Sequence, residues 1–398
     1  MLENDQLCAD ASHAPATTAT LSGSAVTGVA CRVYRAPVTT GVAMSFGALD
    51  YRVMFLVDVA FDDGTVSTGE SWVNYPSWGW RERIATVAEG ITPLLVGRTF
   101  TNTADVRELL LSELTGIARQ WGAIGPVYQA ISAIDQAFWL RAATQRGVSL
   151  SAFLSAHPLA EIPVYGSSLG PAGVTQSAER CLELGLTAAK VKLGFGRERD
   201  DENLASARRV LGDAFRLFGD ANQGWSPREA IELAPMLREH GIEWIEEPLA
   251  GDEPDELGRV FGETGIPIAT GENLYGADAF EPYLAQPGVA LVQPDVGKVG
   301  GVTEYQRVVA AAAASGTLVA PHLYNGAYST AISIQLAAAN PTTPWLEWDI
   351  RQNPVREPVD HLLTAHGTVA VPQGAGIGVD IELGHLSAHR VHISEEAQ

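Results

Sequence analysis

The sequence contains few basic residues. Lys and Arg together number 26 against 47 Asp and Glu, and the formal net charge is −21 at pH 7. Nucleic acids and anionic membrane surfaces are bound by clustered Lys and Arg side chains, so we expect neither as a partner. Cysteine is also scarce, since Cys8, Cys31 and Cys181 lie far apart and form no CxxC pair. This usage predicts buried or incidental thiols in a reducing compartment, and we place the protein in the cytoplasm.

Targeting signals and long apolar runs are missing as well. The N-terminal stretch MLENDQLCADASHAPATTATLSGSA has no basic start and no apolar core, so we do not expect a secretory signal. No run approaches the roughly 18 apolar residues of a membrane span. The Ala, Thr and Ser content of this stretch predicts a mobile tail over residues 1–25.

The first folded region, residues 26–160, has the pattern of an α+β domain. Two strand-like runs within residues 51–73 flank Asp62, Asp63 and Gly64, which is typical of a hairpin turn. Residues 81–150 place apolar side chains at helical spacing. Strands followed by helices predict one α+β domain here.

From residue 161 the pattern changes to strands that alternate with helices. Eight short apolar runs recur, at residues 162–168, 188–194, 215–223, 242–249, 266–273, 290–297, 317–324 and 344–350. Alternation with helices predicts a parallel sheet, and eight units predict a closed α/β barrel over residues 161–355. Residues 356–398 return to short β-like pieces, which we expect to pack back on the first domain.

Every barrel strand from the second onward ends in an ionisable residue. These residues follow one another at steps of 28, 26, 26, 23, 27 and 25 positions: Lys192, Asp220, Glu246, Glu272, Asp295, His322 and Glu347. One strand–helix unit of a barrel takes about 30 residues, so the seven side chains are expected at one height, at the carboxyl ends of their strands. That face of a barrel carries the active site.

Three of these groups, Asp220, Glu246 and Glu272, are carboxylates from consecutive strands. Carboxylates that converge repel one another and would not all stay ionised without a cation. Ligation by oxygen alone suits Mg²⁺, or Mn²⁺ as a substitute, rather than zinc. Because side chains alternate along a strand, we expect either Glu246 or Glu247 to point inward, but not both.

The remaining groups suit proton transfer. Lys190 and Lys192 share one face of a strand, and neighbouring ammonium groups lower each other's pKa, which favours a neutral amine able to accept a proton. His322 and Asp295 end neighbouring strands. A carboxylate that hydrogen-bonds one imidazole nitrogen fixes the tautomer and raises the basicity of the other nitrogen.

Taken together, the motifs resemble the enolase superfamily, and within it the mandelate racemase subgroup, over about residues 26–390. They are K-x-K (190–192), D-x-N (220–222), E-E-P (246–248), G-E-N (271–273), Q-P-D-x-x-K-x-G-G (293–301), P-H (321–322) and W-L-E (345–347). The resemblance implies a modified TIM barrel, (β/α)7β, with an α+β capping domain built from the N-terminal part and the C-terminal segment.

The resemblance also assigns roles to the residues. Mg²⁺ would bind Asp220, Glu246 and Glu272, so that the first Glu of E-E-P is the ligand. Lys192 would be one base, and His322 with Asp295 the other. Glu347 would hydrogen-bond the developing enolate oxygen. The positions expected near the substrate carboxylate or the metal are Lys190, Asn222, Lys298 and Ser167.

The reaction implied is removal of the proton α to a carboxylate. Dehydration of a sugar acid to a 2-keto-3-deoxy acid is the leading hypothesis; a racemase or epimerase of a 2-hydroxy acid, a lactone cycloisomerase and a non-catalytic binding barrel are alternatives. Substrate specificity is expected in two cap loops within residues 39–52 and 74–80, where Trp78 and Trp80 are candidates. Arg52 and Arg81 are the nearest cations, and the absence of a clear clamp for a second carboxylate favours monoacids. We also expect a homo-oligomer.

Overall fold

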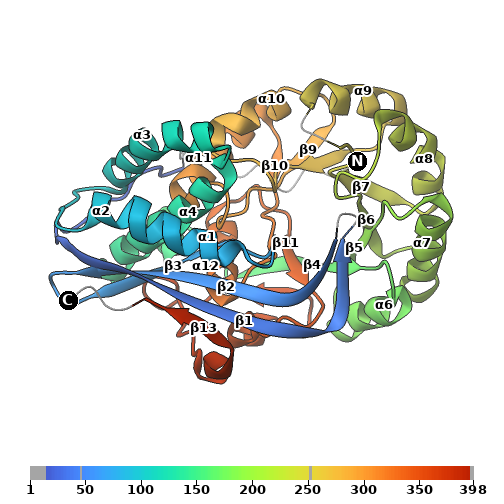
Figure 1. Ribbon diagram of the computed structural model, residues 1–398. Coiled ribbons are helices and arrows are strands. Elements are labelled where there is room, and N and C mark those ends of the chain that lie inside the picture. The colour runs from blue at the N-terminus through green and yellow to red at the C-terminus, as the bar shows by residue number, and fades with distance from the viewer. Residues whose placement is uncertain (1–14, 45–46, 251–252, 395–398) are drawn as a thin grey trace.

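The computed structural model describes residues 15–44, 47–250 and 253–394, which form a cap and a barrel (Figure 1). The cap sheet is antiparallel, in the order β13-β1-β2-β3. Its strands are β1 (Val26–Met44), β2 (Gly47–Phe61), β3 (Val66–Ser71) and β13 (Arg390–Ile393). The predicted hairpin joins β2 to β3: Phe61 N–H donates to Thr65 O (3.0 Å), and Gly64 adopts a φ of 79° that favours glycine.

Helices follow the sheet in the cap, as the apolar spacing predicted. They are α1 (Gly79–Ala85), the π-helix η2 (Thr86–Ile91), α2 (Thr92–Leu95), α3 (Thr103–Trp121), α4 (Ile124–Gln145) and α5 (Leu150–Leu154). Helix α3 starts where the Asn102 side chain accepts from the Asp105 N–H and ends at Gly122 with φ 73°. Helix α4 is buried along most of its length because it packs on the cap sheet and on the barrel.

The barrel consists of eight strands, all parallel to their neighbours, in the order β10-β9-β8-β7-β6-β5-β4-β11. They are β4 (Glu161–Leu169), β5 (Ala188–Lys192), β6 (Arg216–Asp220), β7 (Ile242–Glu246), β8 (Ile268–Thr270), β9 (Val289–Val292), β10 (Leu318–Val319) and β11 (Leu346–Asp349). Strand β10 has only two residues, and among the described residues it forms no ladder with β11. Val319 N–H instead donates to Thr342 O (3.4 Å) in the loop before β11, and Leu323 N–H donates to Glu347 Oε2 (2.9 Å).

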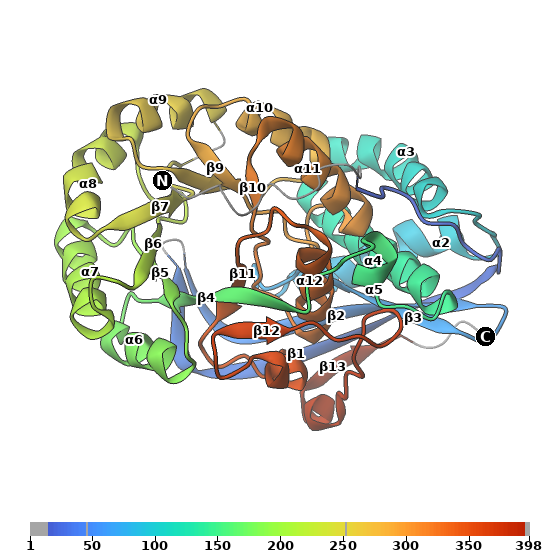
Figure 2. The same cartoon turned by 180° about the vertical axis from the view of Figure 1, so that it is seen from behind.

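Helical segments follow seven of the eight strands and cover the outside of the barrel (Figures 1 and 2). They are α6 (Val174–Glu183), α7 (Arg197–Leu211), α8 (Pro227–Glu239), α9 (Pro254–Thr264), η3 (Ala277–Phe280) with α10 (Glu281–Leu284), α11 (Gly301–Ser315) and α12 (Ala327–Ala339). Seven strand–helix units followed by β11 confirm the predicted (β/α)7β barrel with an α+β cap.

The C-terminal segment returns to the cap. After η4 (Glu357–Leu362), β12 (Thr368–Ala370) and η5 (Gly384–His389), strand β13 pairs with β1, with Arg32 opposite Ile393. The prediction of a mobile tail over residues 1–25 is wrong for residues 19–25. Residues 19–25 are held on the cap, since Ala19 N–H donates to Thr103 Oγ1 (3.0 Å) and Ala25 bridges to Thr99. Residues 1–14, which include Cys8, lie outside the described residues.

Inside the barrel, an aromatic layer lies one step below the charged strand ends. The Phe218 and Trp244 rings stack with centroids 4.3 Å apart, and Tyr165 meets both edge-on. Phe218 and Trp244 each precede a predicted site residue, Asp220 and Glu246, by two positions, and positions i and i+2 share a strand face. The layer therefore forms an apolar floor under the charged groups.

Two polar side chains connect the cap to the barrel. Glu70 of β3 accepts from the N–H groups of Gly326 (2.6 Å) and Ser329 (2.8 Å) at the start of α12. Gln136 of α4 donates to Val296 O (2.9 Å) and accepts from Glu70 N–H (2.8 Å). These contacts fix the cap over the carboxyl ends of the barrel strands. No described helix has the length and apolarity that crossing a membrane would require.

Candidate active site

A cavity of about 700 Å³ lies between the cap and the carboxyl ends of the barrel strands. Its barrel wall consists of strand-end residues and the loops that follow them: Ser168, Lys190, Lys192, Asn222, Gln223, Glu272, Asn273, Tyr275, Lys298, His322, Tyr324 and Glu347. Its cap wall comprises Trp72, Tyr75, Pro76, Trp78, Glu82, Arg83, Trp121, Gly122, Ala123, Pro126 and Gln129. Four residues of the predicted ring, Lys192, Glu272, His322 and Glu347, thus line the same cavity as the predicted cap residue Trp78.

All three lysines of the chain line this cavity and are buried. Lys190 Nζ lies 2.6 Å from Glu246 Oε2 and 3.0 Å from Glu347 Oε1. Burial alone would lower the pKa of Lys190, but Glu246 and Glu347 raise it well above its usual value. For Lys190 this differs from the expectation of a depressed pKa, because Lys190 has carboxylate partners of its own.

Lys192, at the end of β5, lies beside the end of β6. Its Nζ donates to Asp220 Oδ2 (2.5 Å) and to Asn222 Oδ1 (2.8 Å). The parallel pairing of β5 with β6 places Lys192 opposite Asp220 and so brings the two side chains together. Asn222 has a φ of 42°, which turns the chain away from the strand and leaves its side chain on the cavity wall.

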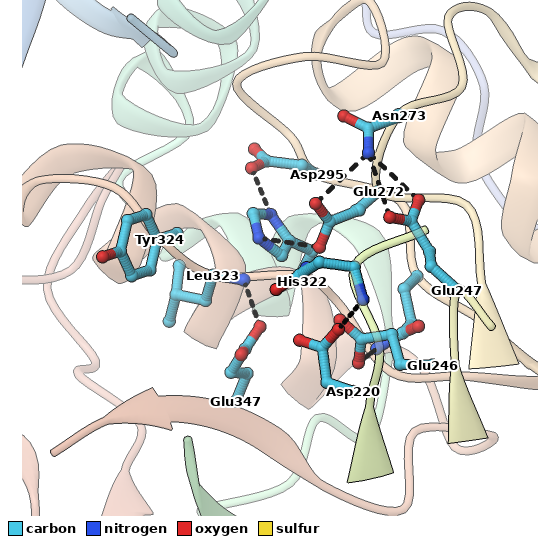
Figure 3. A network of polar contacts seen from close by, with 12 residues as sticks. Asp220, Glu246, Glu247, Glu272, Asn273, Asp295, His322, Leu323, Tyr324 and Glu347 are labelled. Carbon is cyan, nitrogen blue, oxygen red and sulfur yellow. Dashed lines mark hydrogen bonds and ion pairs between the residues drawn. The ribbon is translucent and has the colours of Figure 1, made fainter. Parts of the chain in front are cut away.

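His322 and Asp295 form the expected pair (Figure 3). His322 Nδ1 lies 2.7 Å from Asp295 Oδ2, and Nε2 lies 3.2 Å from Glu272 Oε2. Asp295 is held in turn by Gly297 N–H (2.7 Å) and Asn325 Nδ2 (2.9 Å). Burial opposes the charge on His322, but Glu272 and Asp295 raise its pKa to about 9. Asp295 thus fixes one ring nitrogen and leaves Nε2 directed to the carboxylates at the cavity.

Both glutamates of the E-E-P motif face the carboxylate cluster, which corrects the prediction that only one would (Figure 3). Glu246 ends β7 and bonds to Lys190 and to Gln293 Nε2 (2.6 Å). Glu247 has a φ of 38°, so the alternation of the strand stops there. Its carboxylate accepts from Asn273 Nδ2 (3.0 and 3.2 Å), and burial together with Glu272 and Asp220 raises its pKa to about 8.

Glu347 occupies the end of β11. Its Oε2 accepts from Leu323 N–H (2.9 Å), and its Oε1 faces Lys190. Burial alone would raise the pKa of Glu347, but Lys190 and His322 hold it below its usual range. Glu347 is therefore a carboxylate in the structure as it stands.

The three predicted metal ligands, Asp220, Glu246 and Glu272, lie in one cluster with fitting donor chemistry. Glu246 Oε1 is buried and has no hydrogen-bond partner, and the three side chains offer only oxygen. Within the described part of the chain, however, no group of three or more His, Cys, Asp or Glu side chains is arranged to hold an ion as it stands. Lys190 and Lys192 instead pair with Asp220 and Glu246, so a cation entering between these two carboxylates would have to displace the two ammonium groups.

Not every predicted substrate-binding residue reaches the cavity. Trp78 does, but Trp80 is not among the lining residues and carries the Arg81 guanidinium on its ring (4.3 Å). Ser167 is buried, whereas its neighbour Ser168, with φ 72°, lines the cavity. Residues 45–46 of the first predicted specificity loop lie outside the described residues.

Much of the cap wall was not expected from the sequence. Arg83, Trp121 and Gln129 belong to helices whose place over the barrel depends on the packing of the cap. The two arginines expected nearest the substrate are used elsewhere: Arg52 pairs with Asp349 and stacks on the Tyr324 ring, and Arg81 faces a separate hollow. The helical spacing of residues 81–150 could have identified Gln129 and Arg83 as cavity residues only if the position of the barrel relative to these helices were already known.

Known proteins match the chain along most of its length. The family model "Mandelate racemase / muconate lactonizing enzyme, N-terminal domain" matches residues 27–155, and "Enolase C-terminal domain-like" matches residues 173–384. D-galactarolactone cycloisomerase of Agrobacterium fabrum is 31% identical over 360 residues, which cover 86% of this chain and 92% of that protein. L-talarate/galactarate dehydratase of Salmonella typhimurium is 33% identical over 232 residues, 57% of each chain.

Solved structures agree with these matches. A mandelate racemase/muconate lactonizing enzyme from Bordetella bronchiseptica RB50 superposes with a TM-score of 0.85 at 32% identity, covering 92% of this chain and 100% of that one. A racemase from Streptomyces coelicolor A3(2) with bound magnesium has a TM-score of 0.80 at 25% identity, with coverage of 92% and 100%. The chain therefore belongs to the mandelate racemase/muconate lactonizing enzyme group of the enolase superfamily and is an enzyme of the lyase or isomerase class.

Proposed function

We propose that this enzyme removes the proton α to the carboxylate of a sugar acid and eliminates the β-hydroxyl, which gives a 2-keto-3-deoxy acid. The observation that carries the proposal is that Lys192 and His322, the two candidate proton-transfer residues, line one cavity. Lys192 enters from β5, and His322 with Asp295 enters from the neighbouring ends of β10 and β9. The apolar floor lies below these groups, and cap residues form the facing wall of the cavity.

Asp220, Glu246 and Glu272 would hold Mg²⁺, which when bound supplies positive charge to the substrate carboxylate as its second negative charge develops. The buried Glu246 Oε1 without a partner supports this assignment, and so does the magnesium bound by the Streptomyces coelicolor racemase. Removal of an α-proton is unfavourable because it adds that second charge, so stabilisation of the charge is the main task of the site.

Lys192 and His322 divide the proton transfers. Lys192 can take the α-proton only as a neutral amine, so its contact with Asp220 has to break first. His322, with Nδ1 held by Asp295, gives a proton from Nε2 to the β-hydroxyl, which leaves as water. The resulting enol becomes the 2-keto acid when carbon 3 takes up a proton.

Lys190 and Glu347 would stabilise the substrate carboxylate. Lys190 Nζ lies 3.0 Å from Glu347 Oε1, so a substrate carboxylate that binds Lys190 competes with Glu347 for it. Glu347 can donate a hydrogen bond to the enolate oxygen only after it takes up a proton. Loss of its lysine partner would favour that uptake, because burial alone raises the pKa of Glu347.

A lactone cycloisomerase or a racemase is the second candidate. The D-galactarolactone cycloisomerase of Agrobacterium fabrum aligns over 86% of this chain, more than the Salmonella typhimurium dehydratase does. The same two groups would return a proton to the opposite face of the α-carbon in a racemase, so the geometry serves either outcome.

The test is incubation with Mg²⁺ in D₂O against panels of sugar acids and 2-hydroxy acids. Proton NMR reads exchange of the α-hydrogen, and a keto acid assay reads dehydration. Exchange with keto acid formation supports the dehydratase, whereas exchange without it supports the racemase or cycloisomerase. A Lys192→Ala variant as active as the wild type would contradict the proposal and favour a non-catalytic barrel.

Three further features belong to the proposal. Mn²⁺ would replace Mg²⁺, since both accept carboxylate oxygens. The enzyme would work in the cytoplasm, in keeping with the unpaired Cys31 and Cys181. It would assemble as a homo-oligomer, which analytical ultracentrifugation can test.

A further inference from the structure

The cap wall contains a buried cation that the proposed reaction does not use. Arg83 of α1 lines the cavity and is only 2% exposed. Within the described residues, its one carboxylate neighbour inside 4.0 Å is Glu82, whose Oε2 lies 3.6 Å from Arg83 Nε. Arg83 Nε itself has no hydrogen-bond partner. Burial lowers the pKa of Arg83 to about 10, although Glu82, which also lines the cavity, acts in the opposite direction.

The surrounding contacts hold the guanidinium rigidly. Nη1 donates to Ser71 Oγ and to Trp72 O (3.2 Å), and Nη2 donates to Gln129 Oε1 (2.6 Å). A guanidinium only donates, so the oxygen of the Gln129 amide must face Arg83. The amide nitrogen of Gln129 is thereby turned the other way, toward the hydroxyl of Tyr275 at 3.5 Å.

Gln129 and Tyr275 both line the cavity beside Arg83. The set therefore offers amide N–H and phenol O–H groups to the cavity, backed by a cation. On the barrel wall of the same cavity, Lys190 binds the reacting carboxylate in the proposed function. Donors backed by positive charge bind a carboxylate more strongly than they bind a neutral hydroxyl.

We infer that Arg83, Gln129 and Tyr275 form the subsite for the far end of the substrate, and that this end carries a second carboxylate. The enzyme thus takes dicarboxylic sugar acids in preference to monocarboxylic ones. The inference rests on the proposed function for the reacting end, and it replaces the expectation of a monoacid that followed from the apolar cap loops alone.

The closing experiment compares six-carbon aldaric acids with aldonic acids of matched configuration, which differ only in a carboxylate or a hydroxymethyl group at carbon 6. We expect kcat/KM to favour the diacid by roughly 10- to 100-fold, the effect of one hydrogen bond to a charged group. Arg83→Gln should remove most of this preference by lowering kcat/KM for the diacid only. A variant that failed to fold would instead lose kcat/KM for both acids to the same extent.

Two variants keep the test interpretable. Arg81→Gln makes the same change of charge on the same helix, but Arg81 does not line the cavity, so the preference should stay. Tyr275→Phe deletes only the hydroxyl and leaves Arg83 in place, and it should reduce the preference several-fold. Equal values of kcat/KM for aldonic and aldaric acids in the wild-type enzyme would overturn the inference.

Binding provides a readout that does not need turnover. With Mg²⁺ present, calorimetry should show adipate binding at least about ten-fold tighter than 6-hydroxyhexanoate, and Arg83→Gln should abolish the difference. Equal binding of the two compounds to the wild type would refute the subsite. If no acid exchanges its α-hydrogen but adipate keeps its Arg83-dependent advantage, the proposed function fails and the subsite stands.

Discussion

The two walls of the cavity differ in chemistry and in origin. The barrel wall presents lysines, carboxylates and His322 from successive strand ends, and these groups contact one another within hydrogen-bonding distance. The cap wall presents Trp72, Trp78 and Trp121, with Arg83 as its buried cation. A regular strand register can bring many charged side chains to one point. The helices and loops of the cap instead contribute mostly bulky aromatic side chains, which determine the shape of the cavity. The difference suggests that the barrel wall performs the chemistry and the cap wall selects the substrate.

The largest effects should come from the barrel wall. Replacing Lys192 with Met, or His322 with Asn, should lower kcat by about 10³-fold or more, because each change removes a residue to which the proposed function assigns a proton transfer. Steady-state kinetics on the acid identified by α-hydrogen exchange measures this.

The chain provides a matched control for the histidine. His240 Nε2 lies 2.7 Å from Asp201 Oδ1, the same distance as in the His322–Asp295 pair, but on the outer surface. His240→Asn should leave kcat within about two-fold of the wild type. Equal losses in His240→Asn and His322→Asn would show that the cavity pair has no special role.

Glu347→Gln should have the next largest effect. Gln cannot take up and return a proton, yet it keeps an oxygen for the Leu323 N–H. We expect kcat to fall by about 10²-fold with little change in KM, as for loss of one group that stabilises developing charge. An increase in KM at constant kcat would instead assign Glu347 to substrate binding.

A cap variant should separate binding from chemistry. Trp121 is 56% exposed at the cavity, and Trp121→Ala should raise KM several-fold while kcat stays within about two-fold. Ile117, which is 62% exposed on the same helix and does not line the cavity, is the control. If Trp121→Ala lowers kcat as strongly as Glu347→Gln does, the assignment of chemistry to the barrel wall and of substrate selection to the cap wall is wrong.

The smallest effect concerns the connection between the walls. Burial raises the pKa of Glu70 from about 4.5 to about 7, so the folded state holds this proton more tightly than the unfolded state. The resulting stability is fully present below about pH 4.5 and is lost as the pH rises through 7. An amide in place of this carboxyl group would not titrate, so the stability of the wild type relative to Glu70→Gln should fall by on the order of 2 kcal/mol between about pH 4.5 and 8. Denaturant unfolding at several pH values measures the difference, which should not stay constant.

The barrel side of the site could be predicted because strand register is periodic. Steps of 23 to 28 residues brought Lys192, Glu272, His322 and Glu347 to one cavity, where the structure also has them. The errors fall where the backbone leaves the strand conformation. Glu247, with φ 38°, turns inward beside Glu246, and Ser168, with φ 72°, takes the place expected of Ser167.

The cap side was less predictable for a different reason. Arg83 lies three residues beyond the loop expected to set specificity, and it reaches the cavity only because α1 packs beside β3 and α4. Packing between segments that are far apart in the chain leaves no periodic pattern in the sequence from which it could be predicted. The pKa of Lys190 was missed likewise, because its partners Glu246 and Glu347 come from distant strands.

The confinement of all three lysines to the cavity makes the enzyme unusually suited to spectroscopy. A protein of 42.3 kDa would normally give a crowded set of lysine side-chain signals. Here, biosynthetic labelling of lysine at the ε-carbon and ζ-nitrogen would yield three signals, all from residues that line the cavity. Their chemical shifts against pH would report the protonation of Lys190, Lys192 and Lys298 one by one, with and without metal or acid, and no surface lysine would obscure them.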